Sequence, residues 1–180
     1  MNQQSEEIRF YRCDQPENLS KVDAADAGVC SRLWRPASDE AGPEVFMGFP
    51  SIVYRLFHKF GIFSNSDYSA LCLDSLENGV TLHVSTIFPR FFRFPFMGAN
   101  DLQIGATFTQ PEARGRRLGR IALVLAAQNL AESGRVFWYV TEASNVASCK
   151  VAEGAGFELF ATGRRKDRFG IGLLAAYRFD

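Results

Sequence analysis

The chain has 180 residues, of which 47% are apolar and 22% charged, a composition that is typical of a folded globular protein and argues against a disordered one. Its 20 basic residues balance its 20 acidic residues, so no overall charge favours nucleic acid as a partner. Four isolated cysteines and two histidines argue against a zinc cluster and against a disulfide framework, so we expect no metal and reduced thiols.

The start of the chain, residues 1–7, is polar and acidic, which does not suit a signal peptide. No run of about 18 apolar residues is present that would form a membrane span. We therefore expect a cytoplasmic protein.

The first third of the chain predicts one strand and two helices. Residues 7–12 alternate as in a strand, and residues 17–34 place apolar side chains near helical spacing. The composition of 35–43 is that of a loop. A second helix is predicted over 51–60, with Gly61 as its stop.

The middle of the chain predicts three strands. Residues 68–73 and 80–87 form a hairpin pattern, because the Asn-Gly pair at 78–79 between them is a strong turn signal. An extended, aromatic-rich connection over 88–99 leads into a further strand, 101–109.

The last third predicts a helix over 117–132, a buried strand over 136–141, a short helix capped near 145 and ending near 153, and strands over 157–162 and 171–179. The full order is β-α-α-β-β-β-α-β-α-β-β. We predict a mixed α/β fold, a central mixed sheet with helices on both faces, in a single domain over 1–180.

The most informative segment is 107–120, where a strand runs through a glycine- and arginine-rich turn directly into a helix. Free backbone N–H groups at a helix start bind anions, and Gly115 and Gly119 let a ligand approach closely. Four arginines surround these glycines, so the turn suits a pyrophosphate. Neither nucleotide-binding glycine fingerprint fits the spacing. The alternative is a basic, solvated helix start.

This segment resembles the acyl-CoA-binding turn of the GNAT superfamily, whose pattern is [Q/R]-x-x-G-x-[G/A]. Arg114 matches the leading position and Gly119 the last, whereas Arg117 stands where the middle glycine is usual. The resemblance implies acetyl-CoA as co-substrate, with its pyrophosphate on the amides of 114–119 and its pantetheine arm beside Phe108 and Thr109.

A second block, residues 145–157, resembles the family pattern N-x-x-[A/S]-x-x-x-Y-E-x-x-G-F. The two blocks together imply these residues for the acyl-CoA site: Phe108, Thr109, Arg114, Gly115, Arg116, Arg117, Leu118, Gly119, Arg120, Asn145 and Ser148.

Acyl transfer from a thioester to an amine needs an acid for the thiolate and a donor for the oxyanion. Many GNAT relatives carry a tyrosine acid where this chain has Ala152, so Ser148, about one helical turn earlier, becomes a candidate acid. The alternative is a hydroxyl on the helix surface. The backbone N–H of Phe108 or Thr109 is the candidate oxyanion donor, left free by a bulge.

Relatives with a catalytic base on the central strand carry glutamate about where Gln103 stands, and glutamine cannot serve. Candidate bases are Asp101 on the same strand face, His83 in the neighbouring hairpin, and Glu142 at the sheet opening. Each has a structural alternative: a strand-start residue, a packed histidine and a solvated strand end. Tyr139 is either a core aromatic or part of the same region.

The segment 88–97 interleaves five phenylalanines and a methionine with Arg90 and Arg93. It predicts an acceptor-binding lip, a membrane, partner or homodimer contact, or a connection packed on helix 51–60.

A basic turn is predicted at 163–168. The resemblance to the GNAT superfamily implies that this loop borders the acceptor pocket, as it often does in relatives. Together with Arg90 and Arg93 it favours a phosphate-bearing small-molecule amine, such as a nucleotide-linked aminosugar. A weak likeness of 104–111 to acetyltransferases of polysaccharide pathways ranks that acceptor first. The alternatives are a protein N-terminus as acceptor, and a non-catalytic acyl-CoA-binding domain.

Overall fold

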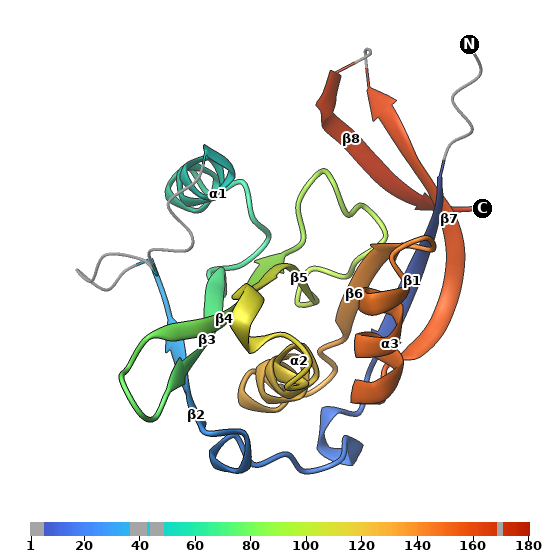
Figure 1. The fold of residues 1–180 in the computed structure, drawn as a ribbon. Coiled ribbons are helices and arrows are strands. Elements are labelled where there is room, and N and C mark those ends of the chain that lie inside the picture. The colour runs from blue at the N-terminus through green and yellow to red at the C-terminus, as the bar shows by residue number, and fades with distance from the viewer. Residues whose placement is uncertain (1–5, 37–42, 44–48, 169–170) are drawn as a thin grey trace.

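The computed structural model describes residues 6–36, 43, 49–168 and 171–180. The described strands form one eight-stranded sheet in the order β2-β3-β4-β5-β6-β1-β7-β8 (Figure 1). The pair β5–β6 is parallel and the other neighbouring pairs are antiparallel. The strands are β1 (Glu7–Cys13), β2 (Val29–Trp34), β3 (Ser69–Ser75), β4 (Thr81–Pro89), β5 (Leu102–Thr109), β6 (Phe137–Glu142), β7 (Glu158–Arg168) and β8 (Ile171–Phe179).

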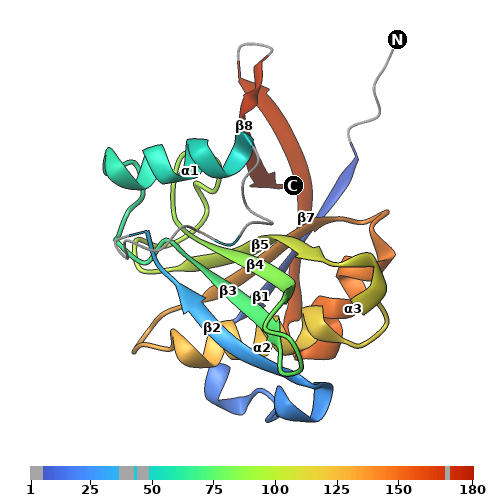
Figure 2. The ribbon, with the colours of Figure 1, turned by 60° about the vertical axis from the view of Figure 1, so that its left-hand side comes forward.

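Helices cover both faces of this sheet, which confirms the predicted mixed α/β fold. Helices α2 (Leu118–Asn129) and α3 (Val146–Ala155) lie on one face, and α1 (Phe49–Lys59) lies on the other (Figure 2). Each face has its own apolar core, and the aromatic residues of the chain gather in the core beneath α1. No helix of the described residues is long and apolar enough to cross a bilayer.

The predicted helix over 17–34 is wrong. Two short 3-10 turns, η1 (Pro16–Asn18) and η2 (Ala25–Ala27), are followed by strand β2. Gly28 ends η2 with a left-handed φ of 69°, and the next six residues pair with β3. The edge of the sheet supplies backbone partners to this segment, and that gain outweighs a weak helical spacing of apolar residues.

The predicted basic turn at 163–168 is also wrong, because these residues continue strand β7. The connection to β8 falls at 169–170, outside the described residues. Gly163 is a glycine of close approach: a Cβ there would lie 2.0 Å from the carbonyl oxygen of Arg178 and 2.9 Å from the ring of Phe10. The glycine lets β7 and β8 pair closely over the β1 core.

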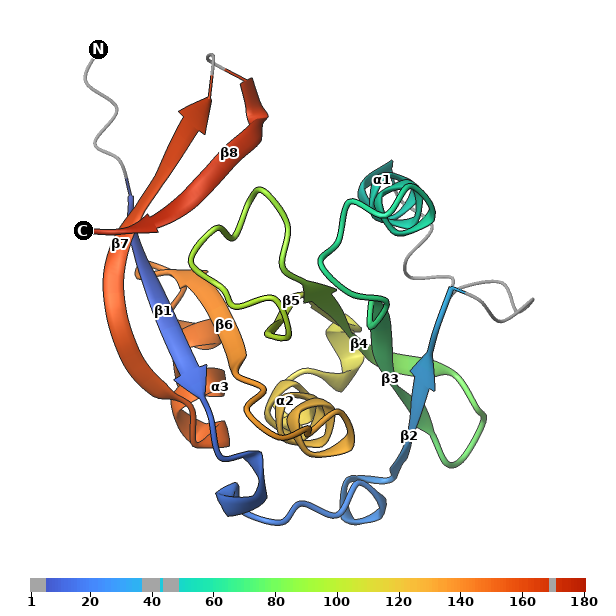
Figure 3. The ribbon, with the colours of Figure 1, turned by 180° about the vertical axis from the view of Figure 1, so that it is seen from behind.

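The first strand lies inside the sheet, where β1 separates β6 from β7 (Figure 3). Tyr11 pairs with Tyr139 on one side and with Leu159 on the other. A period-2 pattern predicts a strand but carries no information about its neighbours, so this placement was not predicted.

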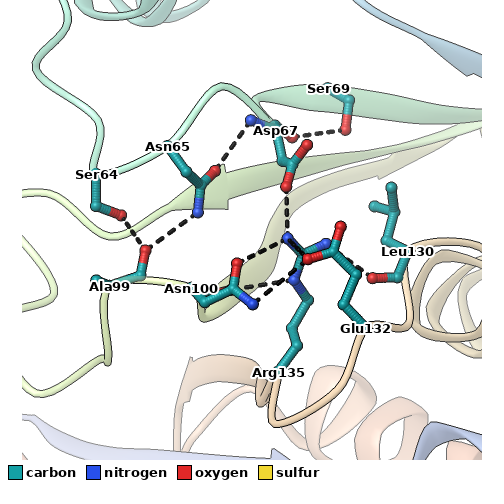
Figure 4. Close-up of polar contacts among 9 residues, drawn as sticks. All are labelled: Ser64, Asn65, Asp67, Ser69, Ala99, Asn100, Leu130, Glu132 and Arg135. Atoms are coloured by element: carbon teal, nitrogen blue, oxygen red, sulfur yellow. Dashed lines mark hydrogen bonds and ion pairs between the residues drawn. The ribbon is translucent and has the colours of Figure 1, made fainter.

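A buried arginine fixes the start of the two central strands (Figure 4). Arg135 is 3% exposed and its Nη2 lies 2.6 Å from Asp67 Oδ2 and 2.8 Å from Glu132 Oε2. The same guanidinium donates to the backbone and side-chain oxygens of Asn100, at 3.1 and 2.9 Å, and to Leu130 O at 2.8 Å. The guanidinium of Arg135 thereby joins three loops, and each of its nitrogens has a hydrogen-bond partner.

Candidate acyl-CoA site

The two central strands separate soon after they meet. Strands β5 and β6 pair in parallel only at Leu102 with Phe137 and at Gln103 with Trp138. Beyond this point no described strand lies beside the edge of β5 that faces β6. Since an unpaired edge presents backbone N–H and C=O groups, this opening can pair with an extended ligand.

A bulge in β5 lies at this opening. Val84 pairs with Phe108 and Thr86 with Gly105, so the β5 side of the pair carries one residue more than the β4 side. Ala106, inside the bulge, has a φ of 45°, which is rare for a residue with a Cβ. The burial of β5 ends here, since 102–105 are buried and 106–108 are exposed. The bulge therefore turns backbone groups toward the opening.

A cleft of about 770 Å³ occupies the opening. Its walls come from the end of β5, the turn after it, the start of α2, one side of α3, and one residue each of β4 and β6. The lining residues are His83, Thr107, Phe108, Thr109, Ala113, Arg114, Gly115, Arg117, Leu118, Gly119, Arg120, Tyr139, Ala147, Ser148, Lys150, Val151 and Gly154.

The charge of this cleft is positive. Arg114, Arg117, Arg120 and Lys150 line it, and its lining contains no carboxylate. Among the described residues, none of the four cations is in an ion pair. The Nε of Arg120 is buried and lacks a hydrogen-bond partner there. Unpaired cations and an unsatisfied buried donor fit an anionic ligand.

The start of α2 adds free backbone donors to the same place. Ile121 N donates to Arg117 O at 3.1 Å. The amides of Leu118, Gly119 and Arg120 come before this bond, so the helix offers them no acceptor. No side chain caps this helix start. The amides and the positive end of the helix dipole therefore lie in the same wall of the cleft as the cations.

The backbone of the turn explains the glycine of the family pattern. Arg117 has φ 60° and ψ 19°, the left-handed conformation that glycine adopts without strain. Arg117 thus adopts a conformation that favours glycine, at a steric cost, and adds a charge to the cleft. Gly115 is likewise left-handed, with φ 81°.

His83 lies at the wall of the cleft and is 2% exposed. Its Nδ1 is 2.7 Å from Thr109 Oγ1 and its Nε2 is 2.8 Å from Ser85 Oγ. Burial lowers the pKa of His83 to about 4. The imidazole is therefore neutral near pH 7, and hydroxyl groups engage both of its nitrogens.

Four of the predicted site residues lie outside the lining of this cleft. Arg116 donates to the carbonyl of Ala27, on the other side of the turn. Asn145 caps α3, accepting from Ser148 N at 3.1 Å. The other two are Asp101 and Glu142.

The carboxylate of Asp101 is buried and accepts from Gly98 N at 2.8 Å and from the indole of Trp138 at 2.9 Å. Glu142 ends β6 as an exposed residue. The contacts of Asp101 hold the loop before β5 in place, as the structural alternative of a strand-start residue predicts.

Sequence reasoning missed some of the residues that the structure brings to the cleft. Lys150, Val151 and Gly154 lie on α3, and their spacings of three, four and seven residues from Ala147 would have placed them on one helix face with it. Tyr139, for which the sequence leaves a core position and a site position open, is 4% exposed and lines the cleft from β6. The divergence of β5 and β6 decides between the two.

The aromatic segment 88–97 is packed, and none of its rings is exposed. Phe91 and Phe94 are buried, their ring centroids 5.2 Å apart, and Phe94 stacks on Tyr177 at 5.4 Å. Arg93 lies over the Tyr177 ring and donates to the hydroxyl of Tyr54. The prediction of a connection packed on the second helix is confirmed.

No family model matches the sequence, and no curated protein does. Solved structures share the fold. A protein described as a GNAT-family acetyltransferase from Novosphingobium aromaticivorans superposes with a TM-score of 0.59 at 16% identity, over 89% of this chain and 62% of that one. A GCN5-related N-acetyltransferase from Sphaerobacter thermophilus gives 0.57 at 17% identity, over 88% and 50%.

A tandem GNAT protein from the clavulanic acid biosynthesis pathway gives a TM-score of 0.55 at 14% identity, over 87% of this chain and 51% of that one. The chain thus spans between 50 and 62% of the length of these three structures. At such identities the likeness is one of fold. The fold of this protein is that of the GNAT acetyltransferases.

Proposed function

We propose that this protein is an acyl-CoA-dependent N-acyltransferase, with acetyl-CoA as its co-substrate and a small primary amine as acceptor. One observation carries the proposal: the cleft opens where β5 and β6 separate, and it is lined by four unpaired cations and the uncapped start of α2. A long ligand with a pyrophosphate at one end and an amide-rich arm at the other suits both parts of this cleft. We also propose that the described elements form one acyltransferase domain.

Within this proposal, Arg114, Arg117, Arg120 and Lys150 would hold the pyrophosphate together with the amides that open α2. Phe108 and Thr109 would pair through their backbones with the pantetheine arm. The backbone N–H of Phe108 or Thr109, next to the exposed bulge at Ala106, would supply the oxyanion donor.

The chemical step is a direct displacement. The amine nitrogen forms a bond to the thioester carbon, the carbon–sulfur bond breaks, the amine loses a proton, and the thiolate gains one. Ser148 and Tyr139 are hydroxyl groups in the cleft lining, so each is a candidate donor to the thiolate. His83 stays a candidate base through its neutral ring, with Thr109 and Ser85 as its hydrogen-bond partners.

The binding half of the proposal is tested by calorimetry with acetyl-CoA, CoA and desulfo-CoA. We expect binding by the wild type, about tenfold or greater loss in Arg114→Ala, and no binding in Gly119→Trp. A Cβ at Gly119 already lies 3.4 Å from Val151 and 3.8 Å from His83, so an indole there fills the cleft. The matched control is Arg178→Ala, which removes an exposed arginine of β8. Absence of binding in the wild type at millimolar ligand would refute the proposal.

The catalytic half is tested by release of the CoA thiol across a panel of primary amines. Nucleotide-linked aminosugars come first, because Arg90 and Lys166 are exposed cations and the sequence favours a phosphate-bearing acceptor. Free aminosugars and peptides with a free N-terminus follow.

A second candidate is an acyl-CoA-binding domain without turnover. It is favoured by Ala152, which is fully buried at the position of the usual tyrosine acid, and by Gln103 at the position of the usual base. Binding of acetyl-CoA without thiol release on any amine would establish this candidate.

A further inference from the structure

The outer side of helix α1 presents apolar side chains to solvent. Ile52, Leu56 and Phe60 follow one another at intervals of four residues and therefore form one stripe along the helix and its end. They are 56%, 44% and 71% exposed. Ile62, just beyond, is 42% exposed. Such a contiguous stripe differs from the scattered apolar residues that any surface carries.

The inner side of α1 is already occupied. Tyr54 and Phe57 pack on the aromatic segment, with ring centroids 4.6 Å from Phe88 and 6.0 Å from Phe91. The stripe is therefore not needed to hold the helix on the sheet.

Among the described residues, the charged groups on α1 beside the stripe are cations. Arg55 and Lys59 are exposed, and no acidic residue occurs from Phe49 to Ser66. The guanidinium of Arg55 lies 5.6 Å from the ring centre of Trp34, which fixes it at the flank of the helix. A groove of about 520 Å³ runs here, and no carboxylate of the described part of the chain lines it. It is lined by Pro36, Ile52, Arg55, Leu56, His58 and Lys59.

Helix α1 lies crosswise at one end of the molecule, and the β7–β8 hairpin rises at the same end (Figures 1, 2 and 3). Lys166, near the end of β7, is an exposed cation of this hairpin.

We propose that α1 docks this protein on an anionic lipid surface. Ile52, Leu56 and Phe60 would enter the boundary between headgroups and acyl chains, and Arg55 and Lys59 would face the lipid phosphates. A helix that lies in the plane of the interface, apolar on one side and flanked by cations, has this partner. A second copy of the chain fits less well, because a two-fold contact would bring the same cations together.

The proposal is tested by sedimentation with phosphatidylcholine vesicles that contain or lack phosphatidylglycerol. We expect binding to the anionic vesicles that falls with added salt. Phe60→Ser should weaken it by about tenfold or more, through lost apolar burial. Lys59→Gln should weaken it roughly fivefold. The matched control is Leu76→Ser in the β3–β4 turn, 58% exposed, which should bind as the wild type does.

No sedimentation with anionic vesicles, equal binding to neutral vesicles, or equal loss in Leu76→Ser would overturn the proposal. A concentration-dependent dimer that Phe60→Ser abolishes would also overturn it, by assigning the stripe to a contact between copies. Unchanged thermal midpoints show that the variants fold. The result is independent of the proposed enzyme activity, because Arg114→Ala should bind vesicles normally and Phe60→Ser should bind acetyl-CoA normally.

Discussion

His83 on β4 and Thr109 on β5 face each other across the antiparallel pair, with Nδ1 and Oγ1 2.7 Å apart. The contact joins the buried core to the wall of the cleft. Because the ring is held between two hydroxyls in a buried site, its protonation affects the stability of the folded protein.

The pKa of His83 is lowered to about 4, against about 6.5 in an unfolded chain. Between these values the unfolded state binds more protons, so the free energy of unfolding falls as the pH drops from about 6.5 to about 4. We expect His83→Gln to lose this part of the pH dependence in urea unfolding. His58→Gln, which changes the other histidine, should keep it. Parallel pH curves for His83→Gln and the wild type would contradict the prediction.

Two substitutions at Arg117 separate the effect of its charge on ligand binding from the effect of its backbone strain on stability. Both Arg117→Gly and Arg117→Ala remove the charge, and we expect both to bind acetyl-CoA more weakly. Only glycine relieves the left-handed φ of 60°, so Arg117→Gly should exceed Arg117→Ala in unfolding free energy by about 1 kcal/mol. Urea unfolding and calorimetry on the two variants make the measurement. Equal stability would show that the turn relaxes around alanine.

Tyr139 and Ser148 are the two candidate acids of the cleft, and substitutions at each distinguish between them. If Tyr139 protonates the thiolate, Tyr139→Phe should lower kcat by about ten- to a hundredfold or more, with KM for acetyl-CoA little changed. If Ser148 does so, Ser148→Ala should have that effect. Steady-state kinetics on the best amine decide between them. Full kcat in both variants would assign the proton to solvent.

Gly163 gives a stability prediction outside the site. A Cβ there would meet the Arg178 carbonyl oxygen at 2.0 Å, so Gly163→Ala should cost about 3 kcal/mol or more. Gly134→Ala is the matched comparison, because Gly134 has a φ of 73° and open space around it. That variant should cost only about 1 kcal/mol of backbone strain. Thermal or urea unfolding ranks the two, and a reversed order would contradict the packing argument.

The sequence predicts local structure well where one pattern dominates. The hairpin around Gly79, helix α2 and helix α3 form where predicted, because turn chemistry and a buried helical face agree there. Segment 17–34 was misassigned because its edge strand is stabilised by β3, which is distant in sequence. Gly163 was taken for a turn residue because a glycine of close approach looks the same in a sequence.

The same distinction applies to the candidate site. The turn at 114–119 is contiguous in sequence, so its place at the start of α2 could be predicted, and its binding of an anion stays a prediction. Lys150 and Tyr139 reach the cleft from two other elements, and only the separation of β5 from β6 brings them there.

The position of β1 has a consequence for folding kinetics. This strand precedes the other described strands in the sequence, yet its partners, β6 and β7, come only after β5. The half of the sheet that contains β1 cannot close until β7 has left the ribosome, and the loop that must close runs from the end of β1 to the start of β6. Such distant pairing slows folding. Until that moment β1 has two unsatisfied edges, and a chain that loses this strand leaves β6 and β7 without the partner that joins them.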